Sequence, residues 1–228
     1  MSNLLETVEI ETAPKPTAAV IWMHGLGADG NDFAPIVPEL VLRDSPAIRF
    51  VFPHAPAIPV TLNNGYVMRA WYDVYPGALE GRSRRTDELG IRASQAAIET
   101  LIAREVDRGV SVDKIVLAGF SQGGAIALQT GLRHPQPLAG IMALSTYLPL
   151  AESLSAESAP ANKKIPIFFA HGSVDPVISL AMAAASRDQL LALDYAVEWR
   201  EYPMPHSVYP EEIQDIARWL RKTLAPGK

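Results

Sequence analysis

The sequence predicts an α/β fold, in which a central, mostly parallel β-sheet carries helices on both faces. Short apolar, β-branched runs alternate with helical patterns from residue 18 onward, and this alternation is typical of a parallel sheet. Residues 114–130, KIVLAGFSQGGAIALQT, join a run typical of a buried strand to a helix through a glycine-rich turn. The 228 residues can bury one sizeable core, and no inserted stretch is large enough for a cap domain. We therefore expect a single domain over residues 1–228.

The expected strands are short runs of apolar and β-branched residues. Residues 18–23, AAVIWM, are apolar throughout, whereas residues 7–11 and 195–202 alternate and fit strands with one exposed face. In chain order we expect strands at residues 7–11, 18–23, 48–52, 115–117, 138–144, 165–170 and 195–202. Ligands of such sheets bind beyond the carboxyl ends of the strands, so the loops that follow these strands are where functional residues are expected.

Helical spacing of apolar residues is clearest at residues 87–109, where Gly109 is suited to a C-cap. In chain order we expect helices at residues 32–42, 87–109, 124–130, 177–193 and 211–224, the first with irregular opening turns because of Pro35 and Pro38. Residues 53–86 and 145–164 show no clear periodicity and are expected to be long loops. A loop as long as the first is usually functional.

Composition excludes several function classes. With 20 basic and 25 acidic residues, the net charge is −5, so the chain lacks the basic surface that binds nucleic acid or an anionic membrane. The chain has no cysteine, which excludes disulfides, thiolate-bound zinc, iron–sulfur clusters and a cysteine nucleophile. The N-terminus lacks the pattern of a signal peptide, and no run is long enough to span a membrane. We therefore expect a cytoplasmic protein.

Ser121 is the candidate nucleophile, at the centre of the pattern G-x-S-x-G. A serine at a sharp strand-to-helix turn adopts a strained backbone conformation, which is tolerated where the residues two before and two after it lack side chains. Gly119 and Gly123 provide that space. The alternative is a glycine-rich turn with an idle serine.

Asp175 and His206 are the candidate partners of Ser121, because a serine hydroxyl needs a base and the base needs an orienting carboxylate. Each follows a predicted strand, and the chain order Ser, Asp, His matches that of the G-x-S-x-G hydrolases. Two simpler interpretations remain open: Asp175 could cap the helix predicted near Val177, and His206 could be a surface histidine. His171 is expected to hydrogen-bond the local backbone.

The oxyanion of the reaction needs two N–H donors. The residue after the nucleophile, Gln122, is expected to supply one. The turn His24-Gly25-Leu26-Gly27 follows the strand at residues 18–23, and Leu26 is expected to supply the other. The alternative is a plain glycine-rich turn.

Several motifs together resemble a known family over residues 18–222. They are HGLGADGNDF (24–33), PVTLNNG (59–65), RAWYD (69–73), AGFSQGG (118–124), LST (144–146), HGSVDPV (171–177) and the stretch 204–208. The chain is similar to bacterial carboxylesterases of the acyl-protein thioesterase/lysophospholipase group. Two positions depart from the pattern of the group: Pro205 precedes the candidate base where glycine is usual, and Asn64 replaces a glycine. Both departures concern substrate preference rather than the chemistry.

The resemblance implies an α/β-hydrolase fold without a large lid, a Ser–Asp–His triad and no metal or organic cofactor. Carried over position by position, it makes Ser121 the nucleophile, His206 the base and Asp175 the orienting acid, with Leu26 and Gln122 as oxyanion donors. It also places Trp71 at the wall of the substrate pocket. Members of the group often form homodimers, and the sequence does not distinguish a homodimer from a monomer.

These observations predict a serine carboxylesterase that acts through an acyl-enzyme. The absence of a cap predicts an open site, and hence short to medium acyl chains in small-molecule esters. An acyl-protein thioesterase acting on acylated proteins and a lysophospholipase acting on lysolipids use the same residues and remain alternatives. A binding module on a hydrolase scaffold is a remote alternative, because such proteins usually lose a triad member.

Overall fold

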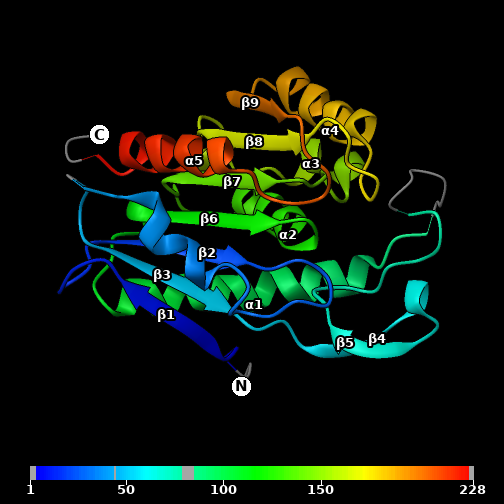
Figure 1. Ribbon diagram of the computed structural model, residues 1–228, viewed down its shortest axis with the longest axis horizontal. Helices are drawn as coiled ribbons and strands as arrows, with labels where there is room; N and C mark the ends of the chain where they lie inside the picture. The colour runs from blue at the N-terminus through cyan, green and yellow to red at the C-terminus, as the bar shows by residue number, and fades with distance from the viewer. Residues whose placement is uncertain (1–3, 44, 79–84, 226–228) are drawn as a thin grey trace.

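The computed structural model describes residues 4–43, 45–78 and 85–225. Within these residues, seven strands form one sheet in the order β1-β3-β2-β6-β7-β8-β9, and two more form a separate hairpin (Figure 1). The strands of the sheet are β1 (Thr7–Glu11), β2 (Ala18–Met23), β3 (Ile48–Pro53), β6 (Ile115–Phe120), β7 (Gly140–Leu144), β8 (Ile167–Gly172) and β9 (Val197–Tyr202). The edge strand β1 is antiparallel to β3, and every other pairing in the sheet is parallel.

The helices cover both faces of the sheet, as the alternation of patterns predicts. The α-helices are α1 (Glu88–Asp107), α2 (Gln122–Arg133), α3 (Ala151–Glu157), α4 (Leu180–Ala192) and α5 (Pro210–Thr223). Buried side chains of α1 to α4 pack in one apolar cluster, and those of α5 and of the 3₁₀-helix η1 (Ala34–Leu40) pack in another on the opposite face. The fold is that of the α/β hydrolases.

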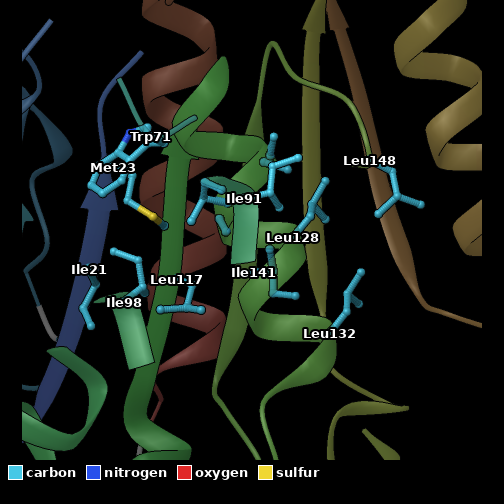
Figure 2. Close-up of a cluster of buried hydrophobic side chains, with 14 of the residues drawn as sticks. Ile21, Met23, Trp71, Ile91, Ile98, Leu117, Leu128, Leu132, Ile141 and Leu148 are labelled. Carbon is cyan, nitrogen blue, oxygen red and sulfur yellow. The ribbon is translucent and has the colours of Figure 1, made fainter. Parts of the chain in front are cut away.

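The central strands divide their side chains between these two clusters because successive residues of a strand point to opposite faces. In β2, Ile21 and Met23 lie in the first cluster, whereas Val20 and Trp22 lie in the second. Figure 2 shows Ile21, Met23, Leu117 and Ile141 of three parallel strands against side chains of α1 and α2. Burial on both faces explains why these strands are apolar throughout rather than alternating.

Three sequence predictions need correction. The α-helix expected at residues 32–42 is instead the shorter 3₁₀-helix η1, Ala34–Leu40, and Pro38 inside it removes a backbone donor. The expected loop at residues 53–86 contains a hairpin, in which β4 (Ala57–Val60) and β5 (Tyr66–Arg69) pair around the 3₁₀ turn η2 (Thr61–Asn63). Residues 79–84 of that loop lie outside the described residues. The expected loop at residues 145–164 contains α3.

Two helix boundaries also differ in ways that affect the site. Helix α2 begins at Gln122, directly after Ser121, rather than at residue 124. Helix α4 begins at Leu180, and the side chain of Ser179 accepts a hydrogen bond from the N–H of Met182 at its N-terminus. In the part of the chain that is described, no helix is long and apolar enough to cross a membrane.

Candidate active site

Ser121 sits in the tight turn between β6 and α2 with φ 54° and ψ −120°, a strained conformation for a residue with a side chain. A Cβ atom at Gly119 would lie 2.2 Å from the carbonyl carbon of Gly123, and one at Gly123 would lie 2.3 Å from the carbonyl oxygen of Met23. Both glycines are therefore required by close backbone approach. This agrees with the steric argument made from the G-x-S-x-G pattern.

The neighbouring strand holds the turn in place. The Ser121 N–H donates to the carbonyl of Leu144 at 2.8 Å, and the hydroxyl of Thr146 donates to the carbonyl of Ser121 at 2.6 Å. Both partners belong to the end of β7 and the residues that follow it. The strained residue is thus anchored through its N–H and its carbonyl, while its side chain is left for chemistry.

Asp175 and His206, which are 31 residues apart, meet beyond the ends of β8 and β9. The His206 Nδ1–H donates to Oδ2 of Asp175 at 2.7 Å. The other carboxylate oxygen accepts the N–H groups of Val177 at 2.8 Å and Ile178 at 3.0 Å. A carboxylate cannot donate, so this bond fixes the proton on Nδ1 and leaves the lone pair of Nε2 available as a base. Asp175 does not cap α4, because Ser179 does.

His206 lies beside the serine turn. Its ring centroid is 4.7 Å from that of Phe120, the residue directly before Ser121. Among the described residues, the hydroxyl of Ser121 makes no hydrogen bond, so the contact between Ser121 and His206 stays a prediction. Hydrogen bonds of this kind are often long in unliganded enzymes and shorten when substrate binds.

His171 contacts the loop that carries Asp175. It is fully buried, and its Nε2 donates to the carbonyl of Ile178 at 2.8 Å, as expected of a histidine that bonds the local backbone. The same nitrogen lies 3.6 Å from Oδ2 of Asp175. Burial lowers the pKa of His171, so its ring is neutral at neutral pH. The ring therefore places a polar but uncharged group against the carboxylate.

The turn from His24 to Gly27 lies against the serine, since a Cβ atom at Gly25 would be 3.5 Å from the Cβ of Ser121. The Nδ1–H of His24 donates to the carbonyl of Gly25 at 2.7 Å, and Nε2 accepts the N–H of Ala55 at 3.1 Å. Burial lowers the pKa of His24, which keeps this ring neutral. His24 therefore shapes the turn.

Both predicted oxyanion donors lie in this region. Gln122 is the first residue of α2, where backbone N–H groups have no partner within the helix. Within the described parts of the chain, neither the Leu26 N–H nor the Gln122 N–H is bonded to a backbone carbonyl. Their roles as donors stay a prediction.

Trp71 links the His24–Gly27 turn to the first residue of α2 through hydrogen bonds. Its indole N–H donates to the carbonyl of His24 at 2.9 Å, and its backbone N–H donates to the side-chain oxygen of Gln122 at 2.8 Å. The side-chain nitrogen of Gln122 in turn donates to the carbonyl of Tyr72 at 2.7 Å. Trp71 is 2 % exposed, and Figure 2 shows it beside Met23 at the end of β2. Beside the expected role as pocket wall, which stays a prediction, the structure thus gives Trp71 a role in bracing the turn.

Residues on either side of the β4–β5 hairpin also hold the His24–Gly27 turn in place. The N–H of Gly27 donates to the carbonyl of Arg69 at 2.9 Å, and the Arg69 guanidinium donates to the carbonyl of Ala55 at 2.7 Å. No local sequence signal predicts these contacts, because each joins residues far apart in the chain. Across the described residues, no group of three His, Asp or Glu side chains is arranged to hold a metal ion.

Comparisons with known proteins identify the family of the chain. The model of the phospholipase/carboxylesterase family matches residues 5–224. Acyl-protein thioesterase 1 of Neurospora crassa is 42% identical over 222 residues, covering 94% of this chain and 90% of that protein. Acyl-protein thioesterase 1 of Mycosarcoma maydis is 41% identical, covering 97% and 98%. The crystal structure of Arabidopsis thaliana SOBER1 is 30% identical with a TM-score of 0.86, covering 91% and 99%. Both of these thioesterases are fungal, so the comparisons support the family but not the bacterial group that the sequence suggested.

Proposed function

Because this chain belongs to the phospholipase/carboxylesterase family of carboxylic ester hydrolases, we propose that it is a serine hydrolase that removes acyl groups from acylated proteins. The names of the two similar thioesterases, at 42% and 41% identity, carry the choice of substrate. They favour the thioesterase alternative over the simple carboxylesterase that the sequence suggested first.

The proposed chemistry follows from the positions of the candidate residues. The Ser121 hydroxyl attacks the acyl carbon while Nε2 of His206 takes its proton, and Asp175 stabilises the resulting imidazolium. The N–H groups of Leu26 and Gln122 bind the negative oxygen of the tetrahedral intermediate. His206 then protonates the leaving thiol or alcohol, and the acyl group remains on Ser121. A water molecule, deprotonated by His206, attacks the acyl-enzyme and releases the carboxylic acid.

The anchored carboxylate supports the assignment of Asp175. Two backbone N–H groups hold one oxygen, so the other is fixed in direction toward the ring of His206. An orienting acid needs this rigidity, because its task is to hold the correct tautomer of the base. A helix cap would not need a histidine on its second oxygen.

The test compares a palmitoylated cysteine peptide, a matched palmitoyl oxygen ester, p-nitrophenyl esters from acetyl to palmitoyl, and a lysophosphatidylcholine. We expect the highest kcat/KM on the thioester peptide. Ser121→Ala should reduce turnover to background, and Asp175→Asn should lower kcat by roughly 10³–10⁴, because the histidine then adopts the wrong tautomer. Thermal unfolding of each variant controls for loss of fold.

Each other outcome has a definite meaning. Turnover that survives in Ser121→Ala would overturn the serine mechanism. A higher kcat/KM on short p-nitrophenyl esters would favour the carboxylesterase, and one on the lysolipid would favour the lysophospholipase. Serine-dependent binding without turnover of any substrate would support a binding module.

A further inference from the structure

The carboxylate of Asp175 depends on the backbone that follows it. Its Oδ1 accepts the N–H groups of Val177 at 2.8 Å and Ile178 at 3.0 Å, so these two groups decide where the other oxygen, Oδ2, lies. Across the described residues, no backbone–backbone hydrogen bond involves residues 176–178. The backbone that holds the carboxylate therefore needs support from a side chain.

His171 provides that support. Its Nε2 donates to the carbonyl of Ile178 at 2.8 Å, and both residues are 0 % exposed. The same nitrogen lies 3.6 Å from Oδ2 of Asp175, which is too far for a hydrogen bond. Because both of these neighbours of Nε2 are oxygens, the proton belongs on Nε2. One N–H thus holds Ile178, and the N–H of Ile178 in turn holds Asp175.

The other ring nitrogen indicates that stability does not explain His171. With the proton on Nε2, Nδ1 is an acceptor, and among the described residues it has no partner. A buried acceptor without a partner destabilises a fold. An apolar side chain of similar length would avoid this cost, but it could not donate to Ile178. The Nε2–H therefore accounts for the histidine, and such local costs are expected beside functional sites.

The charge of the His171 ring also matters to the site. Burial lowers the pKa of His171, so the ring is neutral at neutral pH. A charged ring 3.6 Å from Oδ2 of Asp175 would attract the carboxylate and compete with the imidazolium that forms on His206. A neutral ring supplies its N–H without this competition.

We propose that His171 is a positioning residue of the candidate triad, which fixes Asp175 toward His206 by holding the carbonyl of Ile178. The inference rests on the proposed function and deepens it, because it names a further residue on which the base depends. His171 acts through Asp175 and not on the reacting atoms. Its loss should therefore lower kcat and leave KM almost unchanged, since a fully buried ring takes no part in substrate binding.

Two substitutions of His171 separate the N–H from the volume of the ring. His171→Met keeps an apolar side chain of similar length and removes the donor. It should lower kcat by roughly 10–100-fold, because a small misplacement of a catalytic group has an effect of this size. His171→Gln places a neutral N–H donor near the position of Nε2 and should restore most of that loss.

Phe169→Leu is the matched control. Phe169 lies two residues before His171 in β8, on the same face of the sheet, and is 0 % exposed. Its substitution should lower the free energy of unfolding without changing kcat. Urea unfolding and steady-state kinetics on the palmitoylated cysteine peptide should be measured for all three variants and for wild type.

Nitrogen-15 NMR of the histidine rings tests the contact without a substrate. We expect wild-type His171 to be neutral with its proton on Nε2, and the neutral ring of His206 to carry its proton on Nδ1, toward Asp175. In His171→Met, His206 should become a mixture of the two tautomers, because Asp175 no longer fixes one of them. In His171→Gln, His206 should keep the wild-type tautomer.

The outcomes separate the positioning role from a structural one. Loss of stability without loss of kcat in His171→Met, or equal kcat in the methionine and glutamine variants, would overturn the proposal. A proton on Nδ1 of wild-type His171 would overturn it even if no variant folded. Failure of wild type to hydrolyse any thioester would overturn the proposed function alone, because the tautomers of His171 and His206 still report on the contact with Asp175.

Discussion

Trp71 both packs in the core and holds the turn His24–Gly27, here called the oxyanion turn because it carries the expected donor Leu26. Replacing Trp71 with phenylalanine should separate these two roles. The substitution keeps an aromatic ring and removes the indole N–H, which donates to the carbonyl of His24 at 2.9 Å. His24 is 2 % exposed, so its carbonyl would be left buried without this partner. Leu26, the expected oxyanion donor, lies two residues further along the same turn.

Two magnitudes follow. A buried acceptor without a partner costs about 1–3 kcal/mol, which should appear as a loss in the free energy of unfolding beyond that caused by the smaller ring. The Leu26 N–H remains present but less firmly placed, so kcat should fall by roughly tenfold, less than the ~10²–10³ seen when a donor is removed outright. KM should change little, because the oxyanion exists in the transition state and not in the bound substrate.

Trp22→Phe is the matched control. Trp22 is 1 % exposed and lies on the opposite face of the sheet, and its indole N–H has no partner among the described residues. Its substitution therefore removes the same atoms without removing a hydrogen bond. Urea unfolding and steady-state kinetics on one thioester should be measured for both variants. Equal losses of stability and of kcat in the two variants would refute the bracing role of Trp71.

Two further predictions concern the serine turn and the helix after His206. Gly123→Ala should unfold the protein or destabilise it by several kcal/mol, because its Cβ would lie 2.3 Å from the Met23 carbonyl oxygen, whereas Gly25→Ala meets atoms no closer than 3.4 Å; similar melting temperatures for the two variants would contradict this. Burial raises the pKa of Glu212 from 4.5 to about 8, so the folded state retains a proton that the unfolded chain loses. Stability should therefore fall as pH rises from about 4.5 to about 8, and Glu212→Gln should flatten that decline in urea unfolding; an equal slope in the variant would show that another group is responsible.

Much of the fold could be predicted because its determinants are local or periodic. Residues 18–23 are apolar throughout because both faces of β2 are covered, and this pattern is visible without knowledge of the partners. The turn at Ser121 was predictable because close backbone approach at Gly119 and Gly123 excludes any side chain. Asp175 and His206 could be paired from chain order alone, since each follows a strand of one parallel sheet.

The segments that were predicted wrongly, η1 and the β4–β5 hairpin, lack such local or periodic determinants. In η1, Pro38 interrupts the helical pattern, and the sequence alone does not say whether an α-helix or a 3₁₀-helix results. In the hairpin, β4 leaves two of its four residues exposed and β5 begins with Tyr66 and Val67, which are 69 % and 59 % exposed. Alternation of burial, the usual sign of a strand, is therefore weak.

The brace around the oxyanion turn could not be predicted at all, because every bond in it joins distant residues. Trp71 is 47 residues from His24 and 51 from Gln122, and its partner at His24 is a backbone carbonyl, which carries no sequence signature. Ala55 and Arg69 reach the same turn from both sides of the hairpin. The stretch with the weakest periodicity thus fixes the position of the turn. A change in this stretch should therefore alter kcat through the turn, whereas a change in the strands should alter stability first.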